Sequence, residues 1–267
     1  LVKTFLSPLR ERLQVTMFHD VLSDLVHRTI RGHSVLLSYT ELEGPSQGLF
    51  AVVEKIMDVE NPDAYFAVFF FKHNRSVVII SRSQKDSIEL DGVMAAFGGG
   101  GHKKAASATL KGVMGPQVYE KLMAFLETSL RPAITAAELM TRKVDVIHPD
   151  TSLLEAARFL EEINHTGCPV VDDMEELVGF VTLRDIQKGR RAGQMHAPVK
   201  GYMTRKVIST GPGTTFREME EILLANNIGH LPILEEGKIL GIITRSDYLA
   251  YRKAEKERTR ALTGSLV

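Results

Sequence analysis

The sequence contains only one cysteine, Cys168, so no disulfide bond can form within the chain. A chain without disulfides is suited to a reducing compartment, and we therefore expect a cytoplasmic location. The longest continuous apolar run, residues 64–71, has 8 residues. Because about 20 apolar residues are needed to cross a bilayer, the sequence predicts no membrane-spanning helix and no membrane partner.

Neither sign of charge is in excess, because 33 Lys and Arg residues balance 33 Asp and Glu residues. The chain as a whole is therefore not an electrostatic nucleic-acid binder, although local basic patches remain possible. The sequence also lacks an Asp-His-His string and any Asp-x-Asp pair. A two-metal phosphoryl-transfer site needs several converging carboxylates, so we expect neither catalytic residues nor a metal site in this chain.

The sequence does contain a unit that occurs twice. Residues 139–144 (Leu-Met-Thr-Arg-Lys-Val) recur 63 positions later as residues 202–207 (Tyr-Met-Thr-Arg-Lys-Val), and the Thr-x-x-Asp of residues 182–185 recurs at 244–247. Two copies are too few for a solenoid. We expect two half-domains that bury their apolar faces against each other, with a ligand cleft along the seam.

Each copy predicts the same order of elements. Ser152-x-x-Glu155 and Thr215-x-x-Glu218 are capping boxes that start a helix. Two short strands follow each helix, and the second strand ends at the Thr-x-x-Asp, where another helix starts. The order describes two β-β-α repeats related by a pseudo-two-fold axis, and a charged helical tail follows them.

The chain before the repeats predicts an α/β (α+β) domain with a mixed sheet. Apolar residues recur at three- and four-residue steps over residues 3–30, which indicates mostly helix. The remaining expected elements are a strand at 35–39, a helix at 49–57, a hairpin of 64–71 with 77–80, a short helix at 90–97, a strand near 106 and a helix at 117–130.

The repeats resemble the CBS domain, on the strength of Met140-Thr141 and Met203-Thr204, residues 167–169 and 230–232, and the two Thr-x-x-Asp motifs. This resemblance implies that the pair binds an adenine nucleotide, AMP or ATP or a related adenosine ligand, in shared clefts. The residues implied as ligand contacts are Thr182, Arg184, Asp185, Thr244, Arg245 and Asp247, with backbone groups at Cys168 and Leu231.

The chemistry of the Thr-x-x-Asp motif fits such a ligand. An ionised Asp has two acceptor oxygens, enough for both hydroxyls of a ribose, and Arg184 and Arg245 can meet phosphates. The same motif at a strand-to-helix junction is also a capping box. In that alternative, Asp185 and Asp247 only satisfy helix amides. The sequence leaves open which cleft is competent.

A second motif is the run of four glycines, residues 98–101, followed by His102, Lys103 and Lys104. Glycines permit unusual backbone angles, and their amides can converge on an anion. Arg82, which follows a predicted strand, is a candidate to hold the same phosphate. The alternative is a flexible turn.

Residues 33–128 resemble the DHH-associated domain, the substrate-side lobe of the DHH phosphoesterase superfamily, through residues 79–83, 90–91 and 97–106. By this resemblance, phosphate or sugar groups of RNA or a nucleotide are contacted by Arg82, Ser83, Gly99, Gly100, Gly101 and His102, beside the cation of Lys103. The metal ions of that superfamily belong to a catalytic lobe that we expect outside this chain.

The order of the two domains resembles the middle of the bacterial multidomain tRNA nucleotidyltransferases of the A-adding, poly(A)-polymerase-like family. We therefore expect a non-catalytic fragment that senses an adenine nucleotide, meets tRNA or other RNA through its parent protein, and forms a homodimer through its CBS domains. Two alternatives are a DHH-type phosphoesterase or exonuclease component and a dimerisation scaffold. The expected segments are a linker helix from the DHH lobe (1–32), the DHH-associated domain (33–130), the CBS domains (134–195 and 196–252) and the tail (253–267).

Overall fold

The computed structural model describes residues 12–85 and 87–263. The chain divides into two compact units, Leu1–Ala133 and Ile134–Val267. The first unit is an α/β domain built on a mixed sheet, and the second is a pair of β-β-α repeats, so the predicted fold class is confirmed.

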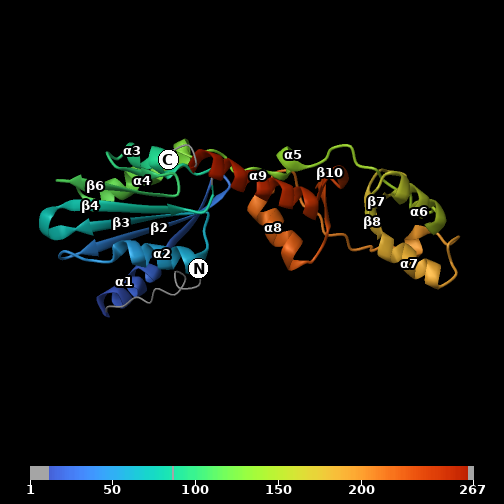
Figure 1. The fold of residues 1–267 in the computed structure, drawn as a ribbon, viewed down its shortest axis with the longest axis horizontal. Coiled ribbons are helices and arrows are strands. Elements are labelled where there is room, and N and C mark those ends of the chain that lie inside the picture. The colour runs from blue at the N-terminus through green and yellow to red at the C-terminus, as the bar shows by residue number, and fades with distance from the viewer. Residues whose placement is uncertain (1–11, 86, 264–267) are drawn as a thin grey trace. The chain divides into compact units, whose positions relative to one another are not determined.

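In the part of the first unit that the structure describes, the strands form one sheet (Figure 1). They are β1 (Val26–Ile30), β2 (His33–Leu42), β3 (Ala64–Phe71), β4 (Ser76–Ser83), β5 (Gly100–His102) and β6 (Ala105–Lys111). The order is β1-β2-β3-β4-β6-β5, in which only β2 and β3 run parallel. The turn between β3 and β4 contains the short helix η2 (Lys72–Asn74).

Helices cover both faces of this sheet. Helices α1 (Arg12–Ser23) and α2 (Leu49–Glu60) pack on one face, and α3 (Leu90–Ala95) and α4 (Gly115–Ser129) pack on the other (Figure 1). Every residue of β3 is therefore buried, which explains why this strand is a continuous apolar run instead of an alternating one.

The helix predicted over residues 3–30 is wrong at its carboxyl end. Helix α1 ends at Ser23, and Val26–Ile30 is the edge strand β1, antiparallel to β2. The turn between them consists of Arg31 and Gly32, with φ values of 50° and 83°, the conformation of a tight hairpin. The predicted start of the helix, residues 3–11, lies outside the described residues.

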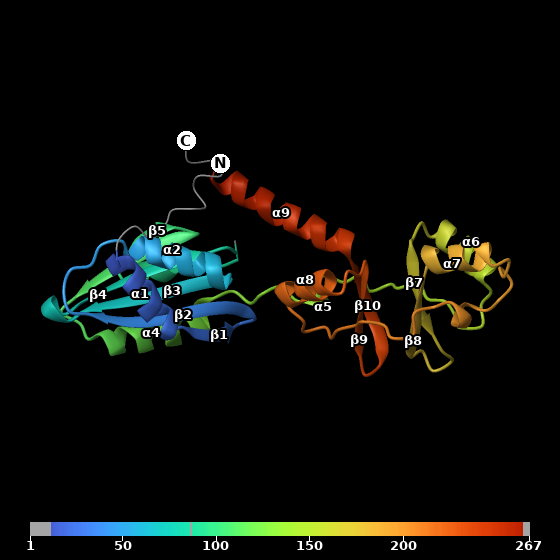
Figure 2. The ribbon, with the colours of Figure 1, turned by 90° about the horizontal axis from the view of Figure 1, so that it is seen from below.

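The second unit contains the two repeats. Repeat 1 comprises α5 (Ala136–Leu139), α6 (Leu153–Glu162), β7 (Gly167–Val171), β8 (Leu177–Thr182) and α7 (Leu183–Arg191). Repeat 2 comprises η3 (Val199–Gly201), α8 (Phe216–Ala225), β9 (His230–Glu235), β10 (Lys238–Thr244) and α9 (Arg245–Thr263). Both predicted capping boxes are present at the starts of α6 and α8. Figure 2 shows the two strand pairs between the helices of the two repeats.

The first segment of each repeat belongs structurally to the other repeat. Thr141 pairs with Ile242 in β10, and Thr204 pairs with Phe180 in β8. Each segment also delivers a methionine to the opposite core: Met140 packs in the core of repeat 2. Neither repeat therefore has a complete core of its own.

Glycines make room for these exchanged methionines. A Cβ atom on Gly241 would lie 2.6 Å from Sδ and 2.9 Å from Cβ of Met140, and a Cβ atom on Gly179 would overlap Met203 in the same way. The two glycines occupy matching positions in the repeats, which explains why both copies need the same residue there.

We predict that Gly241→Ala lowers the free energy of unfolding of the repeat pair by about 1–3 kcal/mol, because the added methyl group displaces Met140. Urea unfolding followed by circular dichroism measures this change. Gly211→Ala is the matched control, since a Cβ atom there meets nothing within 4 Å. Equal losses in the two variants would contradict the prediction.

Candidate functional site

Two clefts open along the seam of the repeat pair. Cleft 1 has a volume of about 700 Å³ and is bounded by the end of β8, the start of α7, residues 204–208 and residues 227–230. Cleft 2 has a volume of about 510 Å³ and is bounded by the end of β10, the start of α9, residues 141–145 and residues 164–167. Each cleft combines the Thr-x-x-Asp of one repeat with the first segment of the other.

The clefts bring together most of the residues that the sequence singles out. Cleft 1 is lined by Thr182, Arg184, Asp185 and Arg245. Cleft 2 is lined by Thr244, Arg245 and Asp247. The arginine at position 245 therefore contributes to both clefts.

Cys168 and Leu231 are buried in the cores of their repeats. The Cys168 thiol donates a hydrogen bond to the carbonyl of Asp145 at 2.8 Å, and burial raises the pKa of the thiol to about 12. This cysteine is therefore a packed, protonated side chain. A ligand contact through the backbone of Cys168 or Leu231 stays a prediction.

Both aspartates of the Thr-x-x-Asp motifs cap a helix. One carboxylate oxygen of Asp185 accepts hydrogen bonds from the backbone N–H and the hydroxyl of Thr182, at 3.1 Å and 2.6 Å. One oxygen of Asp247 accepts the same two bonds from Thr244, at 2.8 Å and 2.7 Å. The capping interpretation is thus confirmed, but it accounts for only one oxygen of each carboxylate.

The second oxygen distinguishes the two clefts. Oδ1 of Asp185 accepts a hydrogen bond from Nζ of Lys188 at 2.8 Å. Oδ1 of Asp247 has no hydrogen-bond partner among residues 12–85 and 87–263. The position in repeat 2 that matches Lys188 is Ala250, which cannot form such a bond. Lys188 was not among the residues that the Thr-x-x-Asp motif indicated, and the difference between Lys188 and Ala250 was the signal that could have revealed it.

His230 lies where the two clefts meet and lines both. Its Nε2 lies 3.3 Å from the hydroxyl oxygen of Thr166, and its ring lies 5.1 Å from that of Phe180. Burial lowers the pKa of His230, the nearby His165 lowers it further, and Asp247 partly opposes both effects. The folded chain therefore favours a neutral imidazole, which offers one donor and one acceptor.

We predict that acidification destabilises the repeat pair through His230. Because its folded-state pKa lies below the usual value of 6.5, the unfolded chain binds the additional proton first as the pH falls. The stabilisation is complete above pH 6.5 and is lost as the pH drops toward the folded-state pKa. Urea midpoints at about pH 7.5 and about pH 5 should therefore differ less in His230→Gln than in the wild type. An equal difference in His230→Gln and in the wild type would contradict the prediction.

In the first unit, Arg82 and His102 share one face of the sheet. Arg82 in β4 pairs with Ala105 in β6, and Ala105 pairs with His102 in β5. Directly paired residues point to the same face, so the two cationic or polar side chains belong to one cross-strand row. The Arg82 guanidinium lies 5.9 Å from the ring centroid of Phe50, which is 51% exposed. No motif in the sequence pointed to Phe50 as a site residue.

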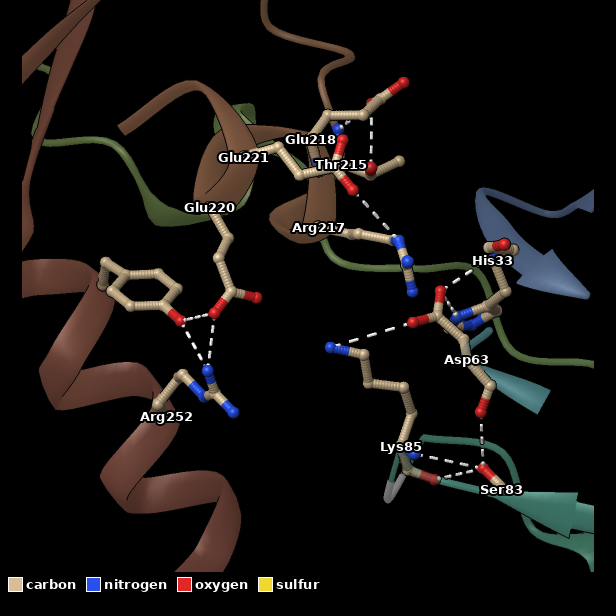
Figure 3. A network of polar contacts seen from close by, with 12 residues as sticks. His33, Asp63, Ser83, Lys85, Thr215, Arg217, Glu218, Glu220, Glu221 and Arg252 are labelled. Carbon is tan, nitrogen blue, oxygen red and sulfur yellow. Dashed lines mark hydrogen bonds and ion pairs between the residues drawn. The ribbon is translucent and has the colours of Figure 1, made fainter. Parts of the chain in front are cut away.

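The other predicted contacts on this unit have protein partners. The hydroxyl of Ser83 is buried and hydrogen-bonds to the carbonyls of Asp63 and Lys85, at 3.1 Å and 2.9 Å (Figure 3). Lys103 forms an ion pair with Glu89 at 2.7 Å. Phosphate binding by Ser83 and Lys103 stays a prediction, and either side chain would first exchange its present partner.

Three of the four glycines have a structural explanation. The amides of Gly98 and Gly99 donate to carbonyls of α3, at 3.0 Å and 2.9 Å, so these two amides complete a helix end. A Cβ atom on Gly99 would overlap the backbone of β6, and Gly101, with a φ of 148°, would place a Cβ atom 2.5 Å from the carbonyl oxygen of Ala105. Gly100 is exposed, and a Cβ atom there meets nothing within 4 Å.

We predict that Gly99→Ala lowers the free energy of unfolding by about 1–3 kcal/mol, because the methyl group would separate β5 from β6. Gly100→Ala, one residue away, should change stability by less than about 0.5 kcal/mol, because its methyl group meets open space. Thermal unfolding of the two variants tests this contrast, and a stable Gly99→Ala protein would overturn it.

Neither a metal cluster nor a membrane helix is found in the described ranges. Among residues 12–85 and 87–263, no three His, Cys, Asp or Glu side chains are close enough to hold a metal ion. Within the same part of the chain, no helix has both the length and the apolar character needed to cross a bilayer.

Comparison with known proteins identifies both units. Residues 32–131 match the DHHA1 domain family, and residues 136–190 and 199–254 match the CBS domain family. The solved structure of CBSX2 in complex with AMP is 27% identical, covers 46% of this chain and 98% of that chain, and has a TM-score of 0.42.

Two curated relatives extend along most of the chain. The A-adding tRNA nucleotidyltransferase of Geobacter sulfurreducens is 27% identical over 97% of this chain, which spans 29% of that protein. The enzyme of the same name from Aquifex aeolicus is 24% identical over 86% of this chain, which spans 27% of it. This chain thus spans less than a third of either relative. The chain belongs to the proteins in which a DHHA1 domain is followed by tandem CBS domains, as the order of its motifs predicts.

Proposed function

We propose that the CBS pair binds an adenine nucleotide, AMP or ATP, in its two clefts, and that the chain is a non-catalytic sensing part of a larger protein that acts on tRNA. The observation that carries this proposal is the composition of the clefts. Each places a carboxylate at a helix start opposite a segment from the other repeat, in a volume of about 510 or about 700 Å³. Ligand pockets of drug-sized molecules have volumes of this order.

The groups around each cleft suit the parts of an adenosine ligand. A carboxylate oxygen accepts hydrogen bonds from ribose hydroxyls, and the guanidinium groups of Arg184 and Arg245 meet phosphates. We propose that backbone groups beside Cys168 and Leu231 contact the base. Because each cleft is shared by two repeats, a bound ligand would stabilise their association.

We propose further that the DHHA1 domain contacts RNA or nucleotide phosphates on the face that carries Arg82 and His102. The exposed ring of Phe50 beside Arg82 adds an aromatic surface of the kind that bases stack on. The variant Gly100→Ala tests this contact when its binding to a short RNA oligonucleotide is compared with that of the wild type. The fold does not require a glycine at this position, so a change in binding would not reflect a change in folding. The similarity of the chain to A-adding tRNA nucleotidyltransferases supports this role.

We also propose that the chain acts in the cytoplasm and that two copies associate through their CBS pairs.

The variant Asp247→Asn tests the ribose-binding role without removing the helix cap. Its amide oxygen can still accept from Thr244, while the NH₂ group replaces the oxygen that has no partner within the described chain. We predict that binding in cleft 2 weakens by about ten- to a hundred-fold, the range for a lost charge-assisted hydrogen bond. Isothermal titration calorimetry with AMP and ATP measures the change.

Thermal unfolding serves as the control for this variant. The melting temperature of Asp247→Asn should stay close to that of the wild type, whereas Asp247→Ala should lose the cap and melt earlier. If affinity is the same in the wild type and in Asp247→Asn, the carboxylate does not hold the ribose.

A further inference from the structure

The two clefts differ in charge at positions that the repeat makes equivalent. Arg184 and Lys188 at cleft 1 correspond to Ser246 and Ala250 in repeat 2. Repeat 2 therefore lacks these two cations, although its Arg245, which lines both clefts, stands where repeat 1 has Leu183. The difference is internal to one chain, so both clefts can be compared in the same protein.

Cleft 2 is also more acidic. Asp145 lines cleft 2 at the position where cleft 1 has Ile208. One lysine is common to both, Lys206 at cleft 1 and Lys143 at cleft 2, and Arg245 lines the two clefts together. The basic side chains thus outnumber the acidic ones at cleft 1 and only balance them at cleft 2.

The cations of cleft 1 are available to a ligand. Arg184 and Lys206 are exposed, and neither forms an ion pair within residues 12–85 and 87–263. Lys188 is 69% exposed and reaches into the same cleft, where its only described ion pair is with Asp185. Three cations around one cleft are an arrangement that suits a chain of phosphates.

The contact between Lys188 and Asp185 occupies the carboxylate oxygen that the proposed ribose contact needs. The Asp185 side chain is only 7% exposed, one oxygen caps α7, and the other accepts from Lys188. A ribose hydroxyl can reach that second oxygen only when the lysine leaves it. A nucleoside without phosphates offers the displaced ammonium group no new partner, whereas a polyphosphate offers several.

We infer that cleft 1 selects nucleoside polyphosphates, because a phosphate draws Lys188 away from Asp185 and so frees the carboxylate for the ribose. In the part of the chain that the structure describes, Asp247 of cleft 2 forms no such ion pair, and this cleft accepts adenosine compounds with few or no phosphates. This inference rests on the proposed function, that the clefts bind adenosine ligands, and assigns a ligand class to each cleft. Lys188 acts here as a specificity-determining residue.

The two clefts can be measured separately with cap-preserving variants. Asp247→Asn reports on cleft 1, and Asp185→Asn reports on cleft 2. In calorimetric titrations of the full chain, Asp247→Asn should bind ATP about ten- to a hundred-fold more tightly than adenosine. Asp185→Asn should show no preference for ATP over adenosine.

Replacing Lys188 tests the release mechanism itself. In the Asp247→Asn protein, Lys188→Ala introduces the residue that repeat 2 has at this position. ATP should then bind about tenfold more weakly, and adenosine should bind more tightly, because the ribose-binding oxygen is free from the start. Lys206→Ala is the matched control: it removes a cation but frees no carboxylate, so it should weaken ATP binding and leave adenosine unchanged.

The outcomes separate this inference from the proposed function. If the wild type binds none of AMP, ATP and adenosine, the proposed function fails, and this inference fails with it. If both ligands bind but cleft 1 shows no preference for ATP, the assignment of ligand classes is overturned. If Lys188→Ala and Lys206→Ala weaken ATP equally and neither strengthens adenosine, the phosphate contact stands, but the release mechanism is overturned.

Discussion

The exchange of first segments between the two repeats is the constraint on which the second unit depends. Met140 completes the core of repeat 2, and Thr141 and Thr204 pair with strands of the opposite repeat. Each core is unfinished without its partner, so the two repeats fold together. The same exchange builds the clefts, because each cleft contains residues of both repeats. A ligand therefore acts on the contact that holds the unit together.

Within each cleft, one carboxylate caps a helix with one oxygen and can accept a further hydrogen bond with the other. An oxygen of Asp185 or Asp247 satisfies amides at a helix start, and the second oxygen is left for another partner. In repeat 1 that partner is Lys188, and in repeat 2 the described chain supplies none. The duplication has thus preserved the helix cap in both copies while changing the group beside it. The difference between Lys188 and Ala250 therefore distinguishes two otherwise similar carboxylates.

The glycine run of the first unit has a packing role at two of its positions. Gly99 and Gly101 allow the short strand β5 to approach β6 without side chains between them. That approach places His102 in the same row as Arg82, although the two residues are twenty positions apart in the sequence. Gly100 pairs with Ser107 in β6, but a Cβ atom there would meet nothing within 4 Å, so the contact between β5 and β6 does not require a glycine at this position.

The sequence by itself determined the repeat, the capping boxes, the apolar strand β3 and the two domain families, because these depend on local periodicity and on motifs within one stretch of chain. It did not determine β1, because the helix-like spacing of apolar residues continues past the end of α1. Residues 26–30 form a strand through their pairing with β2. It could not show the Lys188–Asp185 ion pair, the row of Arg82 and His102, or the composite clefts. Only the tertiary structure decided these, because each depends on which distant segments come into contact.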